Sequence, residues 1–164
     1  MHKISVASLT DLPRIVEIYN QAVLSQNATA DTVPFSVAAR LDWFNQHDAN
    51  QYPIYVCEDE SKQILGYLSL SLYRDRPALA RTAEISYYVD YGQHGMGNGS
   101  ALMQHALEDC ARIGKKVLLA IVLEWNAPSI KLLEKFGFEK WGTLPEVAEF
   151  SGRLCGHVYY GGRV

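Results

Sequence analysis

Apolar residues recur along the chain with two different periods, one typical of strands and one typical of helices. The strand pattern falls at residues 4–7, 54–57, 64–73, 82–89, 116–123, 138–141 and 154–160. The helical pattern falls at residues 12–23, 37–44, 101–111 and 129–136. The predicted order is therefore β-α-α-β-β-β-α-β-α-β-β, which indicates an α/β fold with helices packed on a mixed sheet.

Residues at the helix ends support this assignment. Ser8 and Asp11 have the spacing of a capping box before the first helix, and Ser36 can cap the second. Gly114 is expected to end the third helix. No repeat, low-complexity tract or linker interrupts the pattern, so we expect a single domain over residues 1–164.

Composition narrows the possible functions. The chain has 164 residues and a net charge of −3, which argues against a nucleic-acid partner because phosphate binding needs clustered Lys and Arg. No apolar run is long enough for a membrane span, and the first residues show no signal-peptide pattern. Three widely spaced cysteines predict neither a disulfide framework nor a metal site. We expect a cytoplasmic protein.

A glycine-rich turn, His94 to Ser100, lies between a predicted strand and a predicted helix. Glycines let the backbone approach a ligand, and the free N–H groups of a helix start favour an anion such as pyrophosphate. The same turn is also compatible with a tight connection that binds nothing. A dinucleotide site is a third interpretation, with Glu124 as the ribose-binding acid, although the glycine spacing differs from that fingerprint.

The segments that flank the turn carry a family resemblance over nearly the whole chain. The matching segments are Ile18–Val23, Thr29–Thr32, Trp43–Phe44, Tyr52–Pro53, Arg74–Pro77, Thr82–Val89, Glu124–Ser129 and Leu133–Phe138. Together they resemble the GCN5-related N-acetyltransferase (GNAT) superfamily, and within it the branch of phosphinothricin and methionine-sulfoximine acetyltransferases. The resemblance implies a twisted, mostly antiparallel sheet of about six or seven strands with about four helices. It also implies a homodimer.

The resemblance further implies acetyl-CoA as co-substrate, held in a gap beside the strand that precedes the turn. The implied cofactor-binding residues are Tyr87, Tyr88, Val89, His94, Gly95, Met96, Gly97, Asn98, Gly99, Ser100, Asn126, Ser129 and Lys135. Two of these have a simpler interpretation. His94 stands where the family usually has Arg or Gln and is equally an ordinary surface histidine. Lys135 can meet a CoA phosphate or simply face solvent.

Acetyl transfer needs a neutral amine, so a group must accept a proton from the acceptor. Glu84 lies on an otherwise apolar strand and matches the proposed base of the branch. Burial there would raise its pKa toward a useful range. The alternatives are a solvent-facing Glu84 or an ion pair with Arg81. By resemblance, the backbone N–H of Val89 stabilises the oxyanion.

The family's usual proton donor to the departing thiolate has no counterpart, because Leu133 occupies its position. Transfer can proceed without an acid, or Tyr87 or Tyr88 can serve. A second departure concerns the last strand, where Gly156 and His157 replace the family's usual acidic residue.

Arg74 and Arg76 follow a predicted strand near the expected acceptor mouth. A guanidinium binds a carboxylate through two hydrogen bonds, which would suit an amino-acid acceptor. The two arginines also fit a solvated turn that is paired through Asp75. We therefore predict an acetyltransferase that acts on a small amino-acid-like amine. A peptide N-terminal acetyltransferase and a non-catalytic acyl-CoA-binding module are the alternatives.

Overall fold

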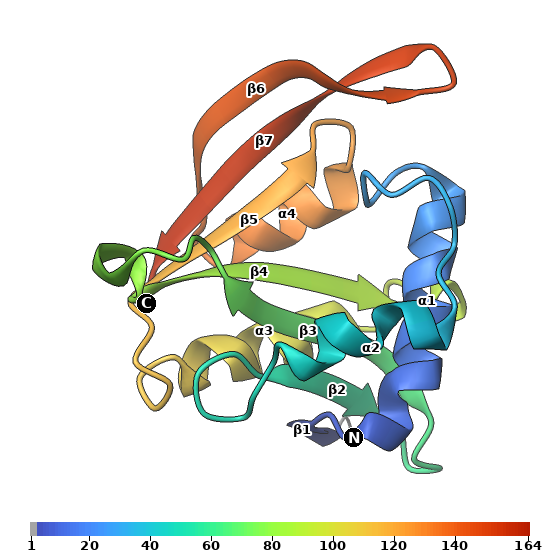
Figure 1. Ribbon diagram of the computed structural model, residues 1–164, viewed down its shortest axis with the longest axis vertical. Coiled ribbons are helices and arrows are strands. Elements are labelled where there is room, and N and C mark those ends of the chain that lie inside the picture. Colours follow the sequence, from blue (N-terminus) through green and yellow to red (C-terminus); the bar gives the residue numbers. More distant parts are fainter. Residues whose placement is uncertain (1–2) are drawn as a thin grey trace.

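A single twisted sheet organises the protein, and the computed structural model describes it over residues 3–164 (Figure 1). The strands are β1 (Lys3–Val6), β2 (Ile54–Glu58), β3 (Ile64–Leu72), β4 (Thr82–Val89), β5 (Val117–Leu123), β6 (Glu139–Phe150) and β7 (Arg153–Arg163). Within the described residues they form a seven-stranded sheet in the order β1-β2-β3-β4-β5-β7-β6. All neighbours are antiparallel except β4 and β5.

Four α-helices in the same part of the chain cover the sheet: α1 (Leu12–Ser25), α2 (Val37–Asn45), α3 (Asn98–Asp109) and α4 (Ala127–Lys135). Both predicted caps form, but the Ser8–Asp11 capping box caps a 3-10 turn (Leu9–Asp11) that leads into α1. The backbone N–H of Ser8 donates to the Asp11 carboxylate at 2.7 Å, and the Ser36 hydroxyl accepts from the Ala39 N–H at 3.1 Å. None of the described helices is long and apolar enough to cross a membrane. The fold class expected from the sequence is confirmed.

The two faces of the sheet bury different helices. The α3 and α4 face holds the larger core, which includes Leu68, Leu70, Ala83, Ile85, Leu102, Met103 and Leu133. On the other face, Ile18 and Tyr19 of α1 pack against Val56 of β2 and Tyr67 of β3. Helix α2 packs against the same cluster. Strand alternation explains the division, because successive side chains of β3 and β4 point to opposite faces.

The parallel neighbours β4 and β5 pair at one end and then diverge (Figure 1). Their pairing covers three positions, from Thr82 with Val117 to Glu84 with Leu119. Beyond Glu84, β4 continues to Val89 beside β3, whereas β5 continues beside β7. The expected gap next to β4 is therefore present, and it begins at Glu84.

Two element boundaries were wrong. The strand expected at 138–141 is the much longer β6, which pairs with β7 in a hairpin that projects from the rest of the protein (Figure 1). Most of β6 is exposed and has bulges near Gly142 and after Leu144, so no apolar alternation reveals it. Helix α3 ends at Asp109, and turns lead from there to Gly114.

Candidate active site

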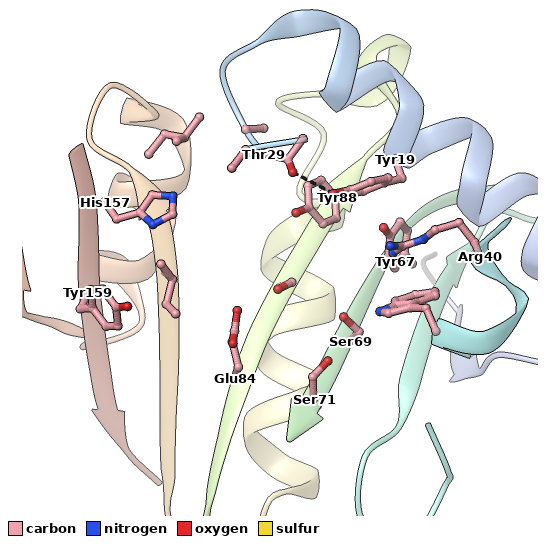
Figure 2. Close-up of a pocket in the computed structure, with 16 residues that line it drawn as sticks. Tyr19, Thr29, Arg40, Tyr67, Ser69, Ser71, Glu84, Tyr88, His157 and Tyr159 are labelled. Carbon is pink, nitrogen blue, oxygen red and sulfur yellow. Dashed lines mark hydrogen bonds between the residues drawn. The ribbon is translucent and has the colours of Figure 1, made fainter. Parts of the chain in front are cut away.

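Two cavities meet at the gap between β4 and β5. The larger, of about 810 Å³, lies along the glycine turn and the start of α4. The smaller, of about 450 Å³, lies on the α1 and α2 face and is the pocket drawn in Figure 2. The residues that line both are Ala28, Ser86, Tyr88 and Ile121. A ligand in one cavity can therefore reach a ligand in the other through the gap. We call them the cofactor cavity and the acceptor cavity.

The glycine turn has the geometry of an anion site. Gly95 and Gly97 have φ of +77° and +86°, a region that favours glycine, and Gly97 caps the N-terminus of α3. A side chain at Gly99 would lie 3.2 Å from Leu132 Cδ2, so glycine lets α3 and α4 approach closely. All three glycines line the cofactor cavity, as does Ser100. The free N–H groups of the α3 start can therefore contact a pyrophosphate.

Two residues of the turn are placed differently. The Met96 side chain is 61% exposed and does not line the cavity. The Asn98 side chain is turned inward, where it donates to the Gln93 carbonyl at 3.1 Å and accepts from the Cys57 thiol. Asn98 lines the cavity but uses its amide to hold the turn. Asn98 can therefore contact a ligand only through its backbone.

Backbone groups of β4 face the open gap. The Asp90 N–H donates to the Leu65 carbonyl at 2.8 Å, which makes these two a hydrogen-bonded pair of the antiparallel ladder. By the alternation of such a ladder, the backbone groups of Val89 and Tyr87 point away from β3, toward β5. His94 Nε2 lies 3.0 Å from the Val89 carbonyl oxygen and must donate to it, since a carbonyl only accepts. The Val89 N–H lies on the same edge of β4, and the alternation of the ladder leaves it facing the gap.

The far wall of the cofactor cavity is α4 and the residues before it. The Asn126 side chain caps this helix by accepting from the Ser129 N–H at 3.3 Å. The Tyr87 hydroxyl lies 2.6 Å from Ser129 Oγ. Lys135 donates to Ser100 Oγ at 3.0 Å and so places a positive charge beside the glycine turn. Asn126, Ser129 and Lys135 all line the cavity.

Strand register builds the floor of the acceptor cavity. In the pairing of β3 with β4, Tyr67 lies opposite Tyr88, Ser69 opposite Ser86 and Ser71 opposite Glu84. These six side chains lie on one face because their positions differ by two along each strand. All six line the acceptor cavity (Figure 2). The alternation of Ser with Leu at 68–72 was the sequence signal for a polar strand face, and our sequence analysis missed it.

Glu84 is the ionisable group nearest to the start of the gap on β4. It lies at the last β4–β5 pair, and its carboxylate makes no ion pair or hydrogen bond with any residue from 3 to 164. The predicted alternative of an ion pair with Arg81 is therefore not seen. Burial raises the pKa of Glu84 above its ordinary value, and the positive charge of Arg74 partly opposes this. A carboxylate in this setting can accept a proton near neutral pH.

Other predicted residues lie outside the cavities. Arg74 and Arg76 are exposed and line neither cavity, although Arg74 is close enough to affect Glu84. Leu133 is fully buried in the core, so this position offers no proton donor. Glu124 accepts from the Gly156 N–H at 2.6 Å, and the mixed sheet excludes the dinucleotide-binding interpretation.

Several lining residues were not predicted from the sequence. In the acceptor cavity they include Tyr19, Arg40, His157 and Tyr159, and in the cofactor cavity Trp125. Trp43, which belongs to one of the segments that carry the family resemblance, also lines the acceptor cavity. Arg40 lies three and four residues before Trp43 and Phe44, so the helical spacing could have placed it on the same face of α2. No cluster of three His, Cys, Asp or Glu side chains suited to a metal is found in the described part of the chain.

A sheet opened between parallel neighbours, with a glycine turn on one side and a half-buried carboxylate on the other, is the arrangement expected of an acyl-CoA-dependent transferase. The chain belongs to the Acetyltransferase (GNAT) family, which it matches over residues 14–138. It is therefore an N-acetyltransferase, and the resemblance inferred from the sequence is confirmed.

Relatives and a solved structure support the assignment. YwnH of Bacillus subtilis is 40% identical over 148 residues, 90% of each chain. The L-methionine sulfoximine/L-methionine sulfone acetyltransferase of Pseudomonas aeruginosa is 37% identical over 147 residues, 90% of this chain and 86% of that protein. The phosphinothricin acetyltransferase (Pat) of Sinorhizobium meliloti, solved in complex with acetyl-CoA, superposes with a TM-score of 0.93. It is 29% identical, and the match covers 99% of this chain and 88% of that chain.

Proposed function

We propose that this protein transfers the acetyl group of acetyl-CoA to the amine of a small amino-acid-like acceptor, of the phosphinothricin or methionine-sulfoximine type. The observation that carries the proposal is the position of Glu84, an unpaired carboxylate in the acceptor cavity at the last β4–β5 pair, where the gap begins. The names of two relatives, which act on L-methionine sulfoximine or phosphinothricin, support the acceptor class. The acceptor cavity, about 450 Å³, suits a small molecule.

The cofactor cavity fits acetyl-CoA. Its glycine turn and α3 N-terminus suit the pyrophosphate, and Lys135 adds a positive charge at the same end. The open backbone groups of Tyr87 suit the amide-bearing arm. Met96 has no part in this fit, and His94 acts by donating to the Val89 carbonyl. When bound, acetyl-CoA supplies an activated acetyl group at the gap.

The residues around the gap then perform three tasks. Glu84 accepts a proton from the acceptor's ammonium group, which leaves a neutral amine to attack the acetyl carbonyl carbon. The Val89 N–H donates a hydrogen bond to the carbonyl oxygen as negative charge develops on it. The carbon–sulfur bond then breaks, the departing sulfur takes a proton, and the nitrogen of the new amide gives up its extra proton, which restores the proton donor.

Tyr88 is the better placed of the two candidate tyrosines for that last proton. It lines both cavities, whereas the Tyr87 hydroxyl is engaged with Ser129. Burial raises the pKa of Tyr88 far above its ordinary value, so the hydroxyl keeps its proton at neutral pH. A proton held beside the gap can pass to the thiolate as it leaves.

Release of CoA thiol tests the function. Purified protein is mixed with acetyl-CoA and a panel of amines that includes methionine sulfoximine, methionine sulfone, phosphinothricin, the common amino acids and short peptides. We expect release with the amino-acid-like amines and a large loss in Glu84→Gln. Turnover of peptides alone would favour the peptide N-terminal acetyltransferase. Binding of acetyl-CoA without turnover of any amine, unchanged in Glu84→Gln, would favour a binding module.

A further inference from the structure

The guanidinium of Arg40 lies in a ring of aromatic side chains in the wall of the acceptor cavity. Its Cζ is 4.1 Å from the ring centroid of Trp43, 4.6 Å from that of Tyr19 and 5.2 Å from that of Phe35. The Arg40 guanidinium makes no hydrogen bond or ion pair within residues 3–164. The rings contact the faces of the guanidinium, and such contacts leave the N–H groups at its edge free. The wall therefore contains a half-buried cation without an anion.

A second unsatisfied donor belongs to the same wall. Tyr67 is 1% exposed, and its hydroxyl is buried without a hydrogen-bond partner among the described residues. Figure 2 shows the Tyr67 and Arg40 side chains next to each other in the cavity. The charge of Arg40 also opposes the effect of burial on the pKa of Tyr67, which agrees with their proximity. A buried hydroxyl that no protein group satisfies costs stability unless a ligand pairs with it.

We propose that Arg40 and Tyr67 form a subsite that binds an anionic oxygen group of the acceptor. An oxyanion can accept two hydrogen bonds from the guanidinium edge and one from the Tyr67 hydroxyl, which satisfies both unpaired donors. The aromatic ring around Arg40 holds the guanidinium in place before the acceptor binds. Arg74 and Arg76, which the sequence suggested for this role, line neither cavity.

The subsite and Glu84 lie at different places in one cavity. Tyr67 pairs with Tyr88 in the β3–β4 register, and Tyr88 lines both cavities. Glu84 lies four residues before Tyr88 on β4, at the start of the gap. An acceptor held by its oxyanion at Arg40 would therefore occupy the same cavity as Glu84, beside the part of β4 that borders the gap. This inference rests on the proposed function and names the part of the acceptor that the cavity recognises.

The test compares acceptors that differ in one charge. Methionine sulfone carries a carboxylate as its single anionic group, its carboxamide carries none, and phosphinothricin carries a phosphinate as well as a carboxylate. We expect Arg40→Gln to lower kcat/KM for methionine sulfone about 10- to 100-fold, mainly through KM, and to leave the carboxamide nearly unchanged. Arg40→Lys should recover part of the loss because it retains the charge. If the carboxylate is not the bound group, the loss should appear with phosphinothricin alone.

Tyr67→Phe is the complementary variant, because it removes a hydroxyl that bonds to nothing in the protein. It should leave the thermal midpoint unchanged or higher and lower kcat/KM several-fold for the anionic acceptor. Arg163→Gln is the matched control: Arg163 stacks on Trp141 at 5.7 Å and lines neither cavity.

Equal losses with charged and uncharged acceptors in Arg40→Gln would overturn the subsite and reduce Arg40 to a packing role. So would full activity of Arg40→Gln on all three acceptors. Absence of turnover by the wild type would instead contradict the proposed function itself. The two failures are therefore distinguishable.

Discussion

Replacement of Glu84 by glutamine removes the proposed base while it preserves the shape of the side chain. The Glu84 carboxylate has no hydrogen-bond or ion-pair partner in the described structure, so the change breaks neither kind of contact. A positioned general base contributes about 10²- to 10⁴-fold to rate. We therefore expect kcat to fall by that factor, which raises the barrier by about 2.7–5.5 kcal/mol. The KM for acetyl-CoA should stay unchanged, because Glu84 does not line the cofactor cavity.

The pH dependence gives the same prediction a second readout. Burial raises the pKa of Glu84 above 4.5, so kcat/KM of the wild type should rise as the pH passes through this raised value. Glu84→Gln should lack that limb and retain the later rise that follows deprotonation of the free amine. Thiol release measured from acidic to mildly alkaline pH, with saturating acetyl-CoA, separates the two profiles.

Stability should respond to the same substitution with a defined sign. The folded protein binds the Glu84 proton more tightly than the unfolded chain, so protonation of Glu84 favours folding at low pH. This contribution is lost as the pH rises through the folded pKa. The thermal midpoint of Glu84→Gln should therefore exceed that of the wild type at neutral pH, and the gap should narrow toward acidic pH.

The matched control is Glu139→Gln, which changes an exposed carboxylate on β6 outside both cavities. It should behave as the wild type in rate and pH profile. A Glu84→Gln variant that kept its kcat within about threefold of the wild type and showed the same acidic limb would rule out Glu84 as the base.

Three further predictions concern other parts of the site. Tyr88→Phe should lower kcat about 10- to 100-fold in the thiol-release assay through loss of the proton donor; an unchanged kcat would mean that the thiolate leaves without this residue. Lys135→Ala should weaken acetyl-CoA binding about 2- to 5-fold by calorimetry, and the effect should shrink at high salt; the same change at Lys140 should have no effect, and equal weakening there would contradict the assignment. Gly66→Ala would place its Cβ 2.9 Å from the Tyr88 carbonyl oxygen and should lower stability by about 1–3 kcal/mol in denaturant unfolding; an unaltered midpoint would show that β4 yields there freely.

The sequence predicts well those features that depend on neighbouring residues. The capping box at Ser8, the cap at Ser36 and the glycine turn before α3 each need a few residues in a row, and all three are present. The hairpin of β6 and β7 extends further than predicted. Its residues lie largely in solvent, so burial imposes no alternating pattern on β6 that sequence analysis can detect.

The acceptor cavity shows why the remaining features were harder to predict. Its wall combines residues from α2, β3, β4 and β7, and their meeting depends on register and helix packing rather than on local sequence. Arg40 therefore resembled an ordinary helix arginine, whereas Arg74 and Arg76 resembled binding residues because of their family motif. Ser69 and Ser71 could be assigned to the cavity only once the pairing of β3 with β4 placed them opposite Ser86 and Glu84.

The most direct measurement identifies the product. Wild-type protein is incubated with acetyl-CoA and methionine sulfone, and the acceptor is then analysed by mass spectrometry with fragmentation to locate the new group. We predict an acetyl group on the amine, formed at the rate at which CoA thiol is released and strongly reduced in Glu84→Gln. Thiol release without an acetylated amine, or an acetyl group that forms equally fast in Glu84→Gln, would contradict the proposed direct transfer with Glu84 as base.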